Sequence, residues 1–197
     1  MPYSPALFAA IAALAVAISA TADDVAPADP FWSLVHDQAV LDDLKLTATQ
    51  QAEWRAALDP IDLACFKLQN KTPAEAKPAL AKLLVEAKAQ LGKLLKPQQA
   101  QRLDQIVVRA QGPAALLRDD LAAKLKLTDK QRSDIRQAVS EAREGREKLQ
   151  RDLRAAKIET AAAEKQLTKL GETERDTINA VLINDQKQKL SLHLARD

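Results

Sequence analysis

One seven-residue pattern occurs twice in this chain, and it constrains where two of its helices begin. Residues 44–50 read LKLTATQ and residues 125–131 read LKLTDKQ, so both contain L-K-L-T-x-x-Q. A threonine followed by a glutamine three residues later is typical of a helix start. The threonine hydroxyl caps a backbone N–H, and the glutamine reaches back to the N–H of the threonine. The predicted structural residues at these helix starts are Leu46, Thr47, Gln50, Leu127, Thr128 and Gln131.

A weaker relative of this pattern follows each copy. Residues 95–99 read LKPQQ and residues 182–186 read LINDQ, and both keep the leucine and the glutamine four residues later. Two matching pairs in one chain indicate an internal repeat. We therefore expect two similar units in tandem, at residues 29–111 and 113–195.

The composition favours helices throughout. Only 3% of the 197 residues are aromatic and four are glycine, whereas strands favour aromatic and β-branched residues. Four glycines that form neither GxGxxG nor GxxxxGK[ST] exclude the glycine-rich phosphate loops. We predict an all-α fold of long amphipathic helices arranged as two helical hairpins.

Apolar residues at helical spacing predict which faces are buried. Two stripes are the clearest, and a proline in the first predicts a kink or a break near Asp59. The second stripe lies on a helix expected over residues 129–157. The two stripes are Trp54, Leu58, Ile61, Cys65 and Leu68, and Ile135, Val139, Ala142, Leu149 and Leu153.

The first 22 residues resemble a signal peptide. An apolar run at residues 6–18 precedes the small-residue triplet Ala20-Thr21-Ala22, and this run is too short to span a membrane. We expect cleavage after Ala22, export to the periplasm and no membrane span in the mature chain. An uncleaved N-terminal anchor is the alternative reading, because no lysine or arginine precedes the apolar run.

Charge is distributed unevenly along the remaining chain. Residues 23–43 hold acidic side chains and no lysine or arginine, so all 29 basic residues lie from Lys45 onward. Residues 23–28 are expected to form an acidic linker. The basic body could steer acidic partners or membrane headgroups toward it, or it could be an ordinary solvated surface. Alternating signs along residues 129–157 favour a solvated helix rather than a nucleic-acid interface.

Paired L-T-x-x-Q motifs in an exported helical chain resemble the Spy/CpxP family of bacterial periplasmic proteins. Leu46-Thr47…Gln50 and Leu127-Thr128…Gln131 match the family motif, and the two weaker relatives match only its first and last positions. The resemblance implies an ATP-independent holding chaperone or an envelope-stress protein, with unfolded or envelope proteins as partners. Family members are small cradle-shaped dimers, so a chain of two units implies a homodimer or a single-chain pseudo-dimer.

The sequence offers few residues for chemistry. With one cysteine and two histidines, Cys65, His36 and His193 cannot complete a usual zinc site, and nothing in the sequence brings them together. We predict a protein that is not an enzyme and has no cofactor, with Cys65 buried. Two alternatives to the chaperone remain open: a structural or signalling module that binds one envelope partner, and a metal-responsive sensor of the same family.

Overall fold

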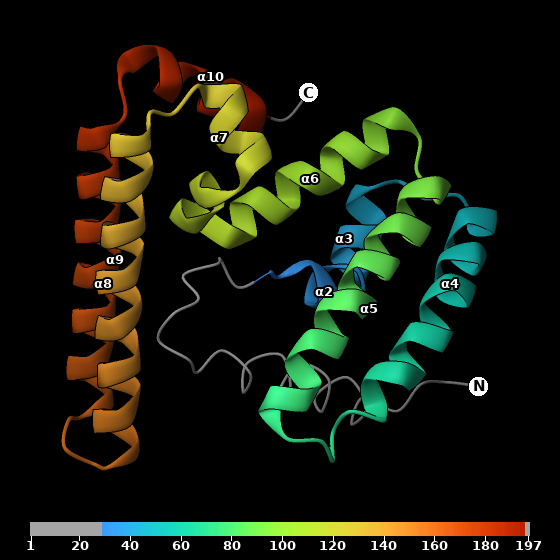
Figure 1. Cartoon of the computed structure of the whole chain (residues 1–197), viewed down its shortest axis with the longest axis horizontal. Coiled ribbons are helices and arrows are strands. Elements are labelled where there is room, and N and C mark those ends of the chain that lie inside the picture. Colours follow the sequence, from blue (N-terminus) through green and yellow to red (C-terminus); the bar gives the residue numbers. More distant parts are fainter. Residues whose placement is uncertain (1–28, 196–197) are drawn as a thin grey trace. The chain divides into compact units, whose positions relative to one another are not determined.

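The computed structural model describes residues 29–195, and these residues form helices and no strand (Figure 1). The all-α prediction is confirmed for this part of the chain. The expected signal peptide at residues 1–22 and the acidic linker at residues 23–28 lie outside the described residues. The described chain divides into two compact units, residues 29–110 and residues 111–195.

The first unit is built around a long helical hairpin. Its helices are, in chain order, α2 (Phe31–Leu34), α3 (Gln38–Asp43), α4 (Ala48–Phe66), α5 (Pro73–Leu94) and α6 (Pro97–Gln111). Helices α4 and α5 lie side by side and are joined by residues 67–72 (Figure 1). The short helices α2 and α3 pack their apolar side chains against this hairpin.

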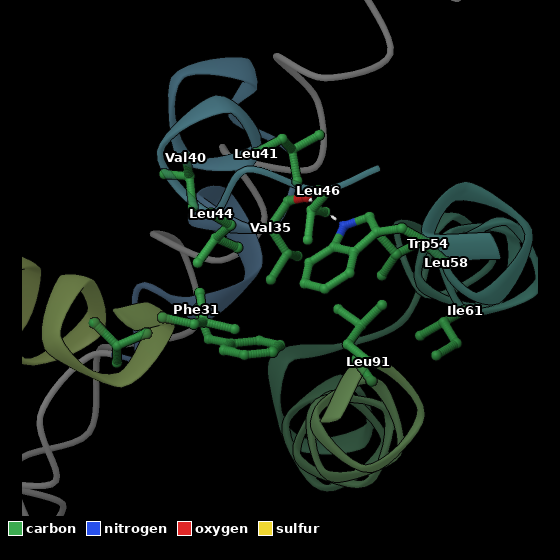
Figure 2. Close-up of a cluster of buried hydrophobic side chains, with 13 residues drawn as sticks. Phe31, Val35, Val40, Leu41, Leu44, Leu46, Trp54, Leu58, Ile61 and Leu91 are labelled. Carbon is green, nitrogen blue, oxygen red and sulfur yellow. Dashed lines mark hydrogen bonds between the residues drawn. The ribbon is translucent and has the colours of Figure 1, made fainter. Parts of the chain in front are cut away.

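The core of the first unit is centred on Trp54. This indole is 1% exposed, and its Nε1–H donates a hydrogen bond of 3.0 Å to the carbonyl oxygen of Val35. Figure 2 shows Leu58, Leu91 and Val35 around the indole ring. The hydrogen bond matters because a buried N–H without a partner would destabilise the fold. It also ties the segment that contains α2 to α4.

Of the kink or break predicted near Asp59, the break is wrong. Helix α4 continues through Pro60 to Phe66, although proline has no N–H to donate to the preceding turn. Leu58 and Ile61, on either side of Pro60, are 4% and 3% exposed. Burial of these side chains keeps the helix continuous where local propensity would end it. Leu68, predicted on the same stripe, lies beyond the end of α4 and is half-buried.

The second unit starts with a tight turn and also contains a long hairpin. Gly112, with φ at +59°, opens a 3-10 helix η1 (Gly112–Leu117), where the left-handed conformation suits glycine. The α-helices that follow are α7 (Asp119–Leu125), α8 (Asp129–Arg154), α9 (Thr160–Val181) and α10 (Asn184–Leu194). Helices α8 and α9 lie side by side (Figure 1).

The buried face of α8 is mostly as predicted. Ile135, Val139, Ala142 and Leu149 are buried, but Leu153 is 40% exposed, so its place on the buried stripe is wrong. Leu153 lies in the last turn of α8, which ends at Arg154 rather than at residue 157. Near the middle of the hairpin the helices approach closely, since a Cβ on Gly145 would meet the side chain of Leu170 at 2.9 Å.

Candidate functional site

In the first unit, two glutamines hold the open end of the hairpin together. Gln50 Nε2 donates to Gln99 Oε1 at 2.9 Å, and Gln99 Nε2 lies 3.3 Å from Gln50 Oε1. Each amide also bonds to a backbone carbonyl across the junction: Gln50 Nε2 to Leu94 O at 2.8 Å, and Gln99 Nε2 to Leu44 O at 3.1 Å. The pair therefore joins the ends of α3 and α5 to the starts of α4 and α6.

The second unit contains the same arrangement. Gln131 Nε2 donates to Gln186 Oε1 at 2.8 Å, and Gln186 Nε2 lies 3.1 Å from Gln131 Oε1. Gln131 Nε2 also reaches Val181 O at 2.9 Å, and Gln186 Nε2 reaches Lys126 O at 3.4 Å. We call these two sets, Gln50 with Gln99 and Gln131 with Gln186, the glutamine pairs.

Each glutamine pair also caps helix starts. Thr47 Oγ1 accepts from Gln50 N at 3.2 Å, and Gln50 Oε1 accepts from Thr47 N at 3.1 Å. Thr128 and Gln131 repeat this geometry at 3.2 and 3.0 Å. Leu46 is buried and Leu127 half-buried. The motif residues are therefore engaged in holding helix ends.

The residue before each motif leucine adopts a left-handed conformation. Lys45 and Lys126 have φ of 51° and 53°. Lys126 directly follows α7, and Lys45 follows Leu44, the residue after α3; the preceding leucines, Leu44 and Leu125, are both buried. This conformation reverses the chain so that the threonine can start the next helix. Lysine is an unusual residue here, because L side chains disfavour this region of φ and ψ.

Cys65 is buried and unsuited to nucleophilic chemistry. Burial, and secondarily the negative charge of Asp62, raise the pKa of its thiol to about 11. A thiol with this pKa stays protonated near neutral pH, whereas the thiolate is the reactive form. Its neighbour Asp62 is instead engaged with His36, whose Nε2 lies 3.1 Å from both carboxylate oxygens.

The other candidate residues are dispersed. His193 Nδ1 contacts Lys124 Nζ at 2.8 Å on the surface of the second unit. Within residues 29–195, no three His, Cys, Asp or Glu side chains gather so that they could hold a metal ion. The same residues include no helix that is long and apolar enough to cross a membrane.

The end of α4 exposes large apolar side chains. Leu63 and Phe66 are 57% and 45% exposed, and one helical turn places them on the same face as Lys67. Lys67 and Lys71, in the connection to α5, are both exposed. We call Leu63, Phe66, Lys67 and Lys71 the α4 end patch. Sequence analysis did not single it out, because spacing alone does not show which apolar residues of a helix stay uncovered.

Comparison with known proteins adds no relative: no family model, no curated protein and no solved structure matches this chain.

Proposed function

We propose that this chain is a Spy/CpxP-like protein of the bacterial envelope that holds non-native proteins without ATP and catalyses no reaction. The observation that carries the proposal is the α4 end patch, which exposes Leu63 and Phe66 near the end of α4 and Lys67 and Lys71 in the connection that follows. The proposed export to the periplasm rests on the signal-peptide pattern of residues 1–22. The proposed likeness to the Spy/CpxP family rests on the two L-T-x-x-Q motifs.

The chemistry of the patch suits weak and unspecific holding. Non-native chains expose apolar side chains, which gain by leaving water against Leu63 and Phe66. Two lysines attract carboxylates of the client at longer range, and this attraction weakens with salt. A patch of two apolar side chains is small compared with a specific protein interface, so a bound segment can be released.

The first experiment measures light scattering by an aggregating unfolded protein with the processed chain, Asp23 onward, and without ATP. We expect suppression near stoichiometric ratios that weakens as salt is added. The variant Leu63→Glu/Phe66→Glu replaces the apolar surface with charge and should require a several-fold higher ratio.

A matched control separates charge from apolar surface. Gln98→Glu/Gln101→Glu adds the same two negative charges to exposed positions of α6 in the same unit. It should suppress scattering as the wild type does. No suppression by the wild type over a wide range of ratios contradicts the chaperone proposal. Suppression that Leu63→Glu/Phe66→Glu leaves unchanged contradicts the role of the patch.

A signalling or structural module is the second candidate, and the α8–α9 hairpin favours it. Helix α8 carries several ion pairs between residues one turn apart, including Lys130–Asp134, Arg143–Glu147 and Lys148–Asp152. A helix with charged side chains of both signs can be recognised by one folded partner of complementary charge. A single envelope protein captured stoichiometrically, with no effect on unfolded clients, would favour this function over the first.

A further inference from the structure

His36 hydrogen-bonds to Trp32 and to Asp62, and these two partners together require both of its ring nitrogens to carry a proton. Nδ1 lies 2.8 Å from the carbonyl oxygen of Trp32, and Nε2 lies 3.1 Å from both oxygens of Asp62. A carbonyl and a carboxylate only accept hydrogen bonds, and a neutral imidazole has only one N–H to donate. The doubly protonated imidazolium is the form that satisfies both partners.

The surroundings of His36 favour this charged form. The side chains of His36 and Asp62 are 13% and 24% exposed, which limits screening by water. The ring centroids of His36 and Trp32 are 5.4 Å apart, close enough for the indole face to attract a cation. Burial, the largest single influence, lowers the pKa of His36, but the bonds to Asp62 and Trp32 and the charge of Asp62 raise it above 6.5.

The other charged groups near this contact have partners of their own. On the same segment, Asp37 accepts from Ala39 N, and Asp29 pairs with Lys88 of α5. Helix α4 contributes Asp62, Cys65, which stays a neutral thiol, and Asp59, one turn before Asp62. Asp62 is thus the acid that pairs with the imidazole in this geometry.

We propose that His36, Trp32 and Asp62 form a proton-dependent latch that fastens the α2 segment to α4. His36 and Asp62 are 26 residues apart, so their contact joins two separate parts of the chain. On the same segment, Val35 is 0% exposed and accepts the indole N–H of Trp54. This latch belongs to the fold of the first unit and does not depend on the proposed chaperone function.

The direction of the pH effect follows from the sign of the shift. The folded state binds the proton of His36 more tightly than the unfolded state, where the ordinary value is 6.5. The contribution of the latch to stability is therefore complete below about pH 6.5 and is lost as the pH rises through the folded pKa. Deprotonation leaves a nitrogen lone pair facing either the Trp32 carbonyl or the Asp62 carboxylate.

The direct test is an NMR titration of the full chain labelled with ¹⁵N-histidine. We expect His36 to show proton-bearing Nδ1 and Nε2 together, with a midpoint above pH 6.5. The variant His193→Gln removes the other imidazole and so assigns the signals. A His36 midpoint at or below pH 6.5, or a neutral ring in the folded protein at pH 6, would overturn the proposal.

The second test asks whether the imidazolium fastens the segment. Exchange of the Trp54 indole N–H with solvent should accelerate above the His36 midpoint beyond its ordinary pH dependence. The extra acceleration is at most tenfold for each pH unit by which that midpoint exceeds 6.5. Asp62→Asn and His36→Gln should both remove it.

Asp37→Asn is the matched control, because it removes a neighbouring carboxylate and keeps an oxygen that can accept from Ala39 N. It should retain the extra acceleration. If Asp62→Asn and Asp37→Asn behave alike, the contact is only structural and the latch is refuted. Where His36→Gln fails to fold, the titration of the wild type and the Asp62→Asn variant decide the question.

Discussion

The α4–α5 and α8–α9 hairpins share the glutamine pair at their open ends and differ in their surfaces. Counting from the paired glutamines in the sequence matches buried apolar positions of the two units: Trp54 of α4 with Ile135 of α8, and Leu91 of α5 with Ile178 of α9. All four side chains are buried. The other corresponding positions of the two hairpins can then be compared residue by residue.

On the outside, the first hairpin is apolar where the second is acidic. Leu63, Phe66 and Val85 are the exposed large apolar residues of α4 and α5. The corresponding positions of α8 and α9 are occupied by Glu144, Glu147 and Glu172, respectively. At these three positions the hairpin therefore does not require an apolar side chain, although the second hairpin exposes Leu153 and Leu167 elsewhere, at 40% and 42%. This contrast is why the proposed client binding is placed on the α4 end patch.

Between the two helices, the first hairpin has small uncharged residues where the second has a pair of charged residues. The first hairpin buries Cys65 and Ala87, at 3% and 0% exposure, where the second has Arg146 and Glu174. Glu174 is 5% exposed and pairs with Arg146. Only the carboxylate of this pair is buried, because the Arg146 side chain is 43% exposed. Without the arginine, the buried carboxylate would have lost its charge partner. The second hairpin therefore depends on a specific pair where the first depends on packing.

The largest expected effect is that of Arg146→Ala. It leaves the buried carboxylate of Glu174 without its partner, and we expect a loss of about 3 kcal/mol from the free energy of unfolding. Urea unfolding followed by far-UV circular dichroism measures it. The double variant Arg146→Cys/Glu174→Ala gives α8 and α9 the residues of the first hairpin and should recover most of the loss. A double variant as unstable as Arg146→Ala would contradict the comparison.

The glutamine pairs should contribute equally to the two units. Gln50→Ala and Gln131→Ala each remove the partner of a second amide and leave a backbone carbonyl unpaired, at a cost of about 2 kcal/mol each. Both tryptophans lie in the first unit, so their fluorescence follows Gln50→Ala while circular dichroism follows both variants. A cost confined to one unit would show that the two junctions are not equivalent.

The smallest effect is a gain in stability. Lys45→Gly and Lys126→Gly relieve the strain of an L residue with positive φ, and each should stabilise its unit by about 0.5 kcal/mol. Lys82→Gly, in the middle of α5, is the control and should destabilise by about 1 kcal/mol. The midpoint temperatures of thermal unfolding of the three variants, each compared with that of the wild type, measure these effects. Destabilisation by either of the first two would mean that the lysine side chain itself stabilises the turn.

Helix starts could be predicted because their causes are local. Thr47 and Thr128 cap helices through contacts with a residue three positions away, which a single sequence displays. The end of α6 at Gln111 likewise follows from Gly112 and Pro113. The prediction of a break near Pro60 was wrong because the burial of Leu58 and Ile61 stabilises the helix by more than the missing hydrogen bond of the proline destabilises it.

The contacts that define the candidate sites could not be predicted, because they join distant residues. Gln99 belongs to the weaker copy of the repeat. Its hydrogen bond with Gln50 joins residues 49 positions apart, and a single sequence does not show such a contact. His36 has Asp37 as its neighbour in the sequence, whereas the fold pairs it with Asp62. The repeated spacing of leucine and glutamine was the one sequence feature that pointed to these contacts. It indicated that each motif has a counterpart later in the chain, but it did not show that the two glutamine side chains hydrogen-bond to each other.

The glutamine pairs have a consequence for how each hairpin opens. A hairpin is ordinarily closed by its connecting loop at one end and can fray from the other. Here Gln50 bonds to Leu94 O and Gln131 to Val181 O, so both hairpins are also fastened at their open ends. Each becomes a closed ring, covalent at the loop and hydrogen-bonded opposite to it. Fraying from the open end must first break this closure, so each hairpin should open in one cooperative step rather than turn by turn.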